Sequence, residues 1–260
     1  MHVQELICFG SNPGDGNPAL VIEHDGLDQP ARQAFAAARN TTCVFLSRQD
    51  DAIEVDYFYP HMRSPLCLHA TLAVAAALFG REGVDPEGTI AVRTAMKGQR
   101  LILSREGGDY FVRLAPQLAP QVAIAGEEVA ALLGAPGLVL ASAPQVASVG
   151  SPKLLIEVDG VETLYGLRPD LAGITAWGKA HGVNGFYVYC RRDAATVEGR
   201  NFNHLDPQLE DGATGVAAGA LAVALGRRLT VRQGRAMGRD CLIKARVEDG
   251  AILVGGRAEP

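Results

Sequence analysis

The sequence has no long apolar run, no basic cluster and no glycine-rich nucleotide-binding pattern. No apolar stretch reaches the roughly 18 residues that cross a membrane, and the first residues, MHVQELICFG, lack the regions of a signal peptide. The net charge of −5 comes without any run of lysine and arginine. Walker A and G-x-G-x-x-G patterns are absent. We therefore expect a cytoplasmic protein with no cofactor, and neither nucleic acid nor membrane as a partner.

Cysteine is scarce and scattered. The five cysteines are odd in number, and no two of them form a C-x-x-C pair. One local group, His61, Cys67 and His69, lacks the spacing of a zinc finger. The sequence therefore predicts neither a disulfide framework nor a metal site.

Short apolar, β-branched or aromatic runs are what the sequence has instead. They predict strands at 3–9, 19–24, 42–47, 53–59, 101–104, 110–114, 154–158, 185–190, 197–202, 241–247 and 251–254. Helical patterns occur at 28–39, 67–80, 126–134, 169–181 and 213–226. This mixture predicts an α+β fold.

A stretch with two prolines and no periodicity, LAPQLAPQV (114–122), indicates a linker near the middle of the chain. We predict an N-terminal lobe over 1–116 and a C-terminal lobe over 117–260, whose last strand crosses to the other lobe. The halves also echo each other: LHATLAVAAAL (68–78) matches DGATGVAAGAL (211–221), and GNPALVIE (16–23) matches GSPKLLIE (150–157). Two echoes in the same order favour duplication over the chance similarity of alanine-rich helices.

Several separate motifs, in order along the chain, resemble those of the PhzF-like phenazine biosynthesis isomerases. They are GNPALVI (16–22), NTTCVFLS (40–47), FYPHMRSPLCLHATLAVAAAL (58–78), GRNFNHLDPQLEDGATG (199–215) and RQGRAMGR (232–239). The resemblance implies the diaminopimelate epimerase-like fold, in which two pseudo-symmetric lobes each wrap a mixed or antiparallel sheet around a central buried helix. It also implies a homodimer and a cofactor-independent isomerase that moves a proton next to a carboxylate of a small substrate, bound between the lobes.

The resemblance also implies which residues form the site. Asp211 and His69 match the family's proton-handling positions, and Cys67 matches a catalytic thiol of the racemase branch. Each of two residues also has a structural interpretation. Cys67 can be a small buried apolar residue, and Asp211 can be an acid that stabilises a helix N-terminus. The expected substrate-binding residues are Gly16, Asn17, Leu68, Ala70, Thr71, Gly212, Thr214, Gly215 and Val216.

The motifs depart from the family pattern at several positions. Asn40 stands where the family has the glutamate that acts as general acid/base, and an amide cannot carry the proton. One alternative is therefore a family member that binds a small carboxylate or a protein without catalysis. Another is that the Asn40 amide holds a carboxylate for a lyase or dehydratase reaction. Unusual replacements at His61, Arg63 and His204 suggest a more anionic substrate than the family norm.

Overall fold

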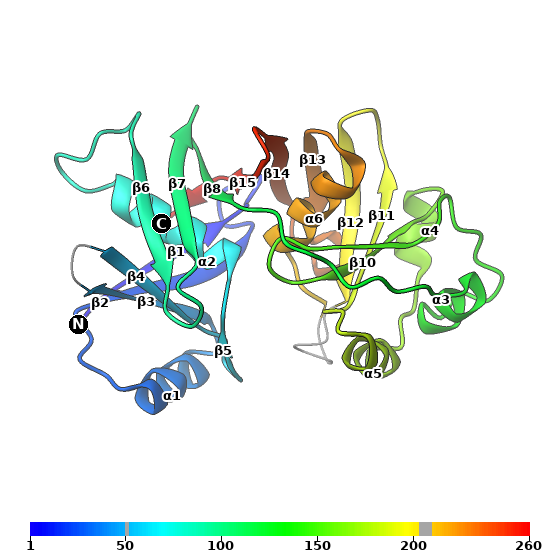
Figure 1. Cartoon of the computed structure of the whole chain (residues 1–260), viewed down its shortest axis with the longest axis horizontal. Coiled ribbons are helices and arrows are strands. Elements are labelled where there is room, and N and C mark those ends of the chain that lie inside the picture. The colour runs from blue at the N-terminus through cyan, green and yellow to red at the C-terminus, as the bar shows by residue number, and fades with distance from the viewer. Residues whose placement is uncertain (50–51, 203–209) are drawn as a thin grey trace. The chain divides into compact units, whose positions relative to one another are not determined.

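The computed structural model describes residues 1–49, 52–202 and 210–260. The chain forms two compact units. The first contains Met1–Leu114 and the returning segment Leu253–Pro260, and the second contains Ala115–Ile252. The segment 115–125 carries no helix or strand. Both units combine a mixed sheet with helices, which confirms the predicted α+β fold (Figure 1).

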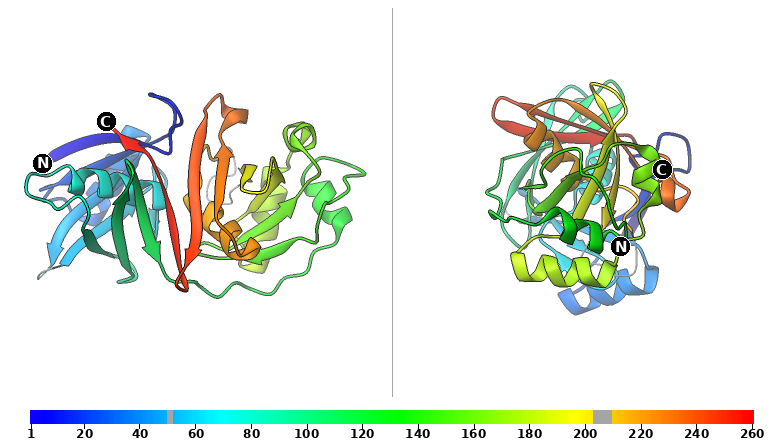
Figure 2. Two further views of the ribbon diagram at one scale, coloured as in Figure 1. Left: turned by 90° about the horizontal axis from the view of Figure 1, so that it is seen from above. Right: turned by 90° about the vertical axis from the view of Figure 1, so that its right-hand side faces the viewer.

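The first unit is a mixed sheet around one helix. Its elements are β1 (His2–Cys8), β2 (Asn17–Glu23), α1 (Gln29–Arg39), β3 (Thr42–Gln49), β4 (Ala52–Phe58), β5 (Arg63–Ser64), α2 (Leu68–Phe79), β6 (Thr89–Thr94), β7 (Arg100–Glu106) and β8 (Asp109–Leu114), then β15 (Ala251–Gly256) and β16 (Ala258–Glu259). The strand order is β16-β1-β2-β3-β4-β6-β7-β8-β15, and β5 pairs with β4. The pairs β2–β3 and β4–β6 are parallel. The C-terminal β16 pairs with the end of β1, at Ile7 and Cys8, so the last strand extends the sheet beside the first (Figure 2).

Helix α2 forms the centre of this unit. All twelve of its residues are buried, and it packs against β1, β2, β3, β7, β8 and β16. A helix that is apolar all round is stable only when it is covered on every side, and the curved sheet supplies this cover (Figure 1). On the opposite face of the sheet, Phe45 and Phe58 form part of a second apolar cluster with Ala36 of α1. The two layers fix where α2 begins and ends.

The second unit repeats this arrangement. Its elements are α3 (Gly126–Leu132), β9 (Gln145–Ala147), β10 (Lys153–Glu157), α4 (Val161–Gly166), α5 (Leu171–His181), β11 (Phe186–Arg191), β12 (Thr196–Phe202), α6 (Gly215–Leu225), β13 (Leu229–Gln233), the 3₁₀ turn η1 (Arg235–Met237) and β14 (Cys241–Glu248). The strand order is β14-β13-β12-β11-β10-β9. Buried helix α6 packs against β9, β10, β13 and β14, while α3, α4 and α5 cover the other face. Trp177 of α5 packs edge-on against Phe186 in the core of this unit.

Some predicted boundaries were wrong. Strands β6 and β13 and helix α4 were missed because TIAVRT, LTVRQ and VETLYG are short and interrupted by polar residues, and the strands β5, β9 and β16, of two or three residues each, were missed as well. Helix α6 begins at Gly215, two residues later than predicted, since Ala213 and Thr214 lie in the turn that carries Asp211. Among the described residues, no helix has the length and apolar character needed to cross a membrane.

Candidate active site

In the first unit, a cysteine and a histidine lie together at the start of α2. Cys67 has an extended backbone just before the helix, and its side chain does not cap the helix. The Cys67 Sγ lies 3.2 Å from Nδ1 of His69, and both residues are buried. The side chain of Tyr59 also hydrogen-bonds to Cys67. The extended residue before the helix therefore turns the thiol back onto the first turn of α2.

Opposing effects act on the Cys67 thiol. Burial raises its pKa, but the charge and hydrogen bond of His69, the hydrogen bond of Tyr59 and the backbone N–H of Ala70 outweigh burial, so the pKa lies below its usual value. A cysteine beside an imidazolium and a helix N-terminus is the usual setting of a reactive thiolate. Cys67 is thus buried, as the apolar interpretation expects, but it has the polar contacts of an acid/base group.

The neighbouring residues of α2 serve the helix itself. Leu68 and Ala70 are buried in the core of the unit. The Thr71 hydroxyl donates to the Cys67 carbonyl at 2.7 Å and lies 2.6 Å from the hydroxyl of Tyr57. These contacts fix the first turn and leave the Cys67–His69 pair as its ionisable part.

Gly16, Asn17 and Asn40 lie where two parallel strands begin. Gly16 has a φ of 125°, and a Cβ there would lie 2.6 Å from the Cys8 carbonyl oxygen, so only glycine fits directly before β2. Asn17 is the first residue of β2. Asn40 is exposed and ends α1 in the left-handed conformation, with a φ of 47°. Asparagine tolerates this conformation better than most residues, so Asn40 has a structural role as the end of a helix.

In the second unit, Asp211 lies in the turn before α6. Its carboxylate accepts hydrogen bonds from the Thr214 hydroxyl at 2.5 Å and from the Ala213 N–H at 3.4 Å. Burial raises the pKa of Asp211, although Thr214 and the positive charge of Lys153 counteract part of this effect. A carboxyl group whose pKa is raised toward neutrality can both accept and release a proton.

Gln233 of β13 holds this turn in place. Its amide nitrogen donates to the Asp211 carbonyl at 2.6 Å and to the Thr214 hydroxyl at 3.0 Å. Its amide oxygen accepts from the Thr214 N–H at 3.3 Å and from the Tyr187 hydroxyl at 3.2 Å. Every polar atom of this buried amide is thus used to fix the residues around Asp211.

Two further buried polar side chains belong to the same region. Lys153 is buried, its ammonium donates to the Asn184 carbonyl, and burial lowers its pKa to about 8 against the opposing effect of Asp211. Asn201 is fully buried, and neither atom of its side-chain amide has a hydrogen-bond partner among the residues that the structure describes. Its backbone carbonyl accepts from the Asp211 N–H at 3.2 Å. An unpaired buried amide costs about 1–3 kcal/mol, so Asn201 is a polar group available to a ligand beside Asp211.

The remaining predicted residues of this unit surround the start of α6. Gly212 and Gly215 are buried, and Val216 is half-buried in the first turn. Thr214 precedes the helix without capping it, since its hydroxyl donates to Asp211. The first N–H groups of a helix have no intrahelical partner and attract negative charge.

Several polar residues of the motifs have partners within their own unit. Glu210 forms a two-pronged ion pair with the buried Arg200, with its shortest distance 2.9 Å, so it has a structural role. Arg63 donates to Asp56 at 2.8 Å, which balances its charge. His61 is exposed and stacks on Tyr59. His204 lies outside the described residues.

The structure therefore places the predicted residues in two groups, one in each unit. Cys67 and His69 form one pair, and Asp211 and Thr214 form another. Sequence reasoning missed Tyr59, Lys153, Asn201 and Gln233. Lys153 carried a visible signal as a charged residue that opens the apolar run KLLIE, and the other three stand inside the family motifs without being singled out there.

Comparison with known proteins supports the motif assignment. The chain is 31% identical to the uncharacterized isomerase YddE of Escherichia coli K12, with 94% of this chain and 89% of that protein aligned. It is 28% identical to the trans-2,3-dihydro-3-hydroxyanthranilate isomerase of Pseudomonas chlororaphis, with 95% of this chain and 91% of that protein aligned.

Solved structures share the fold over nearly the whole chain. A predicted epimerase of Pseudomonas aeruginosa, PA4716, has a TM-score of 0.83 at 27% identity and covers 99% of this chain and 95% of its own. A PhzF-family protein of Bacillus anthracis has a TM-score of 0.82 at 22% identity and covers 100% of this chain and 97% of its own. The model of the phenazine biosynthesis-like protein family, PhzC-PhzF, matches residues 7–259, and the chain therefore belongs to this family, as its motifs predict.

Proposed function

We propose that this protein is a cofactor-independent isomerase or epimerase that moves a proton at a carbon next to a carboxylate of a small molecule. The observation that carries the proposal is Asp211, a partly buried carboxyl with a raised pKa at the start of a buried helix. The names of its relatives, which include isomerases from three bacterial genera, support the same reaction class.

The chemistry follows from the surroundings of Asp211. A C–H bond beside a carboxylate is very weakly acidic, so the charge that develops on deprotonation needs fixed dipoles nearby. The N–H groups in the first turn of α6, which the Thr214 side chain does not cap, and the Asn201 amide, which has no partner in the described part of the chain, supply such dipoles. Asp211 takes the proton as a carboxylate and returns it as an acid, either to the same carbon or to the far end of an allylic system. No electrons are gained or lost in this step.

The Cys67–His69 pair is the acid/base candidate of the first unit. A thiolate with a lowered pKa accepts a proton, and the neighbouring imidazolium stabilises the ionised state. We propose that this pair performs part of the proton handling that the family's glutamate performs elsewhere. Asn40 cannot do so, since its amide does not titrate.

Asn40 favours one alternative function. A family member without the acid/base glutamate can keep the anion-binding turn of α6 and bind a small carboxylate without turnover. The exposed, left-handed position of Asn40 suits an asparagine that serves only the backbone.

Deuterium uptake from heavy water distinguishes the two functions. Amino acids, hydroxy acids and trans-2,3-dihydro-3-hydroxyanthranilate are incubated with the protein in D₂O, and the mass of each compound is followed. We expect exchange with the wild type and a loss of at least about 100-fold in Asp211→Asn, the usual size of a general acid/base contribution. The matched control is Glu162→Gln, an exposed acid of the same unit, which retains exchange.

A lack of exchange in the wild type would instead support the alternative function, binding of a small carboxylate without turnover. If the wild type exchanges none of these compounds while Asn40→Glu gains exchange, the site binds without catalysis. Exchange that persists in Asp211→Asn at the wild-type rate contradicts the role of Asp211.

A further inference from the structure

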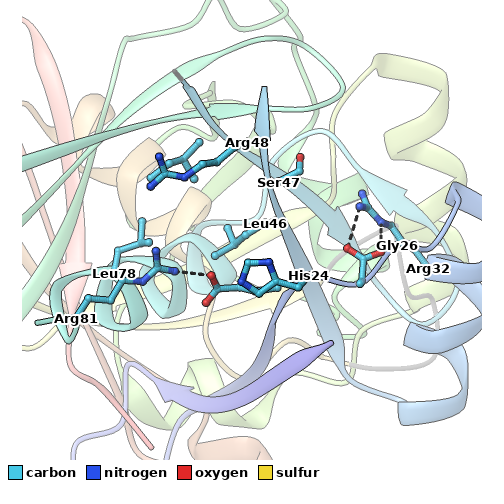
Figure 3. Close-up of a pocket in the computed structure, with 11 residues that line it drawn as sticks. His24, Gly26, Arg32, Leu46, Ser47, Arg48, Leu78 and Arg81 are labelled. Carbon is cyan, nitrogen blue, oxygen red and sulfur yellow. Dashed lines mark hydrogen bonds and ion pairs between the residues drawn. The ribbon is translucent and has the colours of Figure 1, made fainter. Parts of the chain in front are cut away.

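A pocket of about 490 Å³ opens in the first unit at the C-terminal end of α2 (Figure 3). Its lining comes from the ends of β2 and β3, the start of β4, α1 and the loop before it, and the residues that end and follow α2. Cys67 and His69 lie at the other end of α2, which is twelve residues or about 18 Å long. The pocket is therefore separate from the acid/base pair of this unit.

The floor of the pocket is apolar. Leu46, Ile53 and Leu78 line it, and the two leucines are almost fully buried. Alternate residues of a strand point to the same face. Leu46 and Arg48 therefore share the face of β3 that packs on α2. This alternation places a cation directly beside the apolar floor.

The charges around the rim are unequal. Arg32 pairs with Asp25 at 3.0 Å, and Arg81 pairs with Glu23 at 2.6 Å. Within the described part of the chain, Arg48 has no hydrogen-bond acceptor or ion-pair partner. The lining thus carries three guanidinium groups against two carboxylates, which leaves one positive charge unmatched.

His24 adds a second polar group to the rim for which the described residues provide no hydrogen-bond partner. Its φ of 55° is left-handed, a conformation that costs about 1–2 kcal/mol in residues other than glycine. In Figure 3 its ring lies beside Leu46, and Arg48 and Arg81 reach toward the same side of the pocket. The backbone at the end of β2 thus holds an imidazole at the border between the apolar floor and the charged rim.

The end of α2 determines which way a ligand lies. The C-terminus of a helix carries a partial negative charge, which disfavours an anion close to Leu78. An anionic group is stable at the Arg48 side, and an apolar group is stable on the floor. A volume of about 490 Å³ lies within the range of small-molecule sites.

We propose that this pocket binds a small organic acid with an apolar body and one carboxylate. The carboxylate pairs with Arg48, and the ring or branched chain covers Leu46, Ile53 and Leu78. The inference is independent of the isomerase proposal, because it uses none of the residues near Cys67 or Asp211.

The test is an NMR titration of the full chain with benzoate as the probe, which resolves binding residue by residue. We expect the methyl signals of Leu46, Ile53 and Leu78 to shift together. Arg48→Met keeps the apolar stem and removes the charge, and should weaken binding at these signals about tenfold. Arg100→Met, at an exposed arginine of β7 outside the pocket, is the matched control and should leave binding unchanged.

Two comparison ligands make the outcome decisive. Benzylamine has the same ring with the opposite charge and should not shift the three methyl groups. Inorganic phosphate alone should bind less tightly than benzoate, since it has no apolar body. The proposal is overturned if phosphate binds as well as benzoate, if Arg48→Met binds benzoate like the wild type, or if the shifts lie elsewhere. Asp211→Asn should bind benzoate in this pocket as the wild type does, whichever way the isomerase test falls.

Discussion

At the scale of single residues, Cys67 shows most directly how a fold sets the pKa of a side chain. We expect a thiolate absorbance at 240 nm that titrates below the ordinary cysteine pKa of about 8.5, because His69 and Tyr59 stabilise the charged form. Cys67→Ser should remove this signal. His69→Gln should move it to higher pH, since loss of the positive partner disfavours the thiolate.

Cys43 provides the control for this titration. Burial raises the pKa of Cys43 to about 12 and that of Cys190 to about 11, so both remain protonated at pH 8. Cys43→Ser should therefore leave the absorbance near neutral pH unchanged. An equal loss of signal in Cys43→Ser and Cys67→Ser would show that the assignment to Cys67 is wrong.

Lys153 predicts a measurable dependence of stability on pH. Its pKa falls from 10.5 to about 8 on folding. The cost of the buried ammonium is therefore absent above pH 10.5, grows as the pH falls from 10.5 to about 8, and levels off below that at about 3 kcal/mol. The free energy of unfolding of Lys153→Met minus that of the wild type should therefore be about 3 kcal/mol larger at pH 7 than at pH 10.5, which means that the variant gains stability over the wild type as the pH falls.

Comparing variant with wild type at each pH removes the titrations that they share, including those of the buried cysteines and tyrosines. Denaturant unfolding at pH 7, 8, 9.5 and 10.5 provides the measurement. Lys179→Met, at an exposed lysine of α5, should show no such pH dependence. A difference for Lys153→Met that stays constant with pH would rule out the lowered pKa.

Individual site residues differ in how far the sequence predicts them. Asp211, His69 and Cys67 stand in motifs, so their positions follow from the resemblance. Gln233 and Asn201 contact the Asp211 turn only because β12 and β13 are brought beside it by pairing of distant segments. No local pattern encodes such contacts, and the raised pKa of Asp211 depends on burial that only the folded unit creates.

At the scale of elements, the end of α1 sets the conformation of Asn40. Its left-handed backbone favours glycine or asparagine. Asn40→Gly should keep the wild-type free energy of unfolding, whereas Asn40→Glu should lose about 1 kcal/mol through steric strain. Urea unfolding measures both. Ala38→Glu, at an exposed residue of α1 two positions before Asn40, is the control for adding the charge and should change stability much less.

This prediction also affects the function test, because a glutamate at position 40 must overcome that strain. Equal stability of Asn40→Glu and the wild type would mean that the backbone there adapts freely. The family's glutamate would then fit without cost.

Helices α2 and α6 were the most predictable elements. Runs of alanine, leucine and valine without polar interruption indicate a helix covered on all sides, and both helices are buried. Strands β6 and β13 were missed, since their polar and apolar residues are mixed and their place in the sheet depends on pairing with β4 and β12. Pairing between segments far apart in sequence decided these elements, and local propensity did not.

At the scale of the whole molecule, the return of the C-terminus to the first unit has a measurable effect. Removal of Leu253–Pro260 takes β16 from β1 and most of β15 from β8. We expect hydrogen exchange to speed up at least tenfold in peptides of β1 and β8, which lose partners at both edges of their sheet. Peptides of β10 and β11 should exchange as in the full chain.

Mass spectrometry of deuterium uptake measures exchange in the peptides of both units in one sample. Uniform acceleration across both units would mean that the units unfold together. Unchanged exchange in β1 and β8 would mean that the C-terminal strands do not stabilise the first unit.

The same return of the chain has a consequence for how the protein is made. A ribosome delivers the N-terminus first, and domains generally fold in the order of synthesis. Here the segment that completes the first unit, Leu253–Pro260, is made after the whole of Ala115–Ile252, which is continuous. The second unit can therefore be complete while the apolar helix α2 still waits for β16. During that interval the nascent chain carries an incompletely covered apolar helix, the kind of segment that chaperones bind.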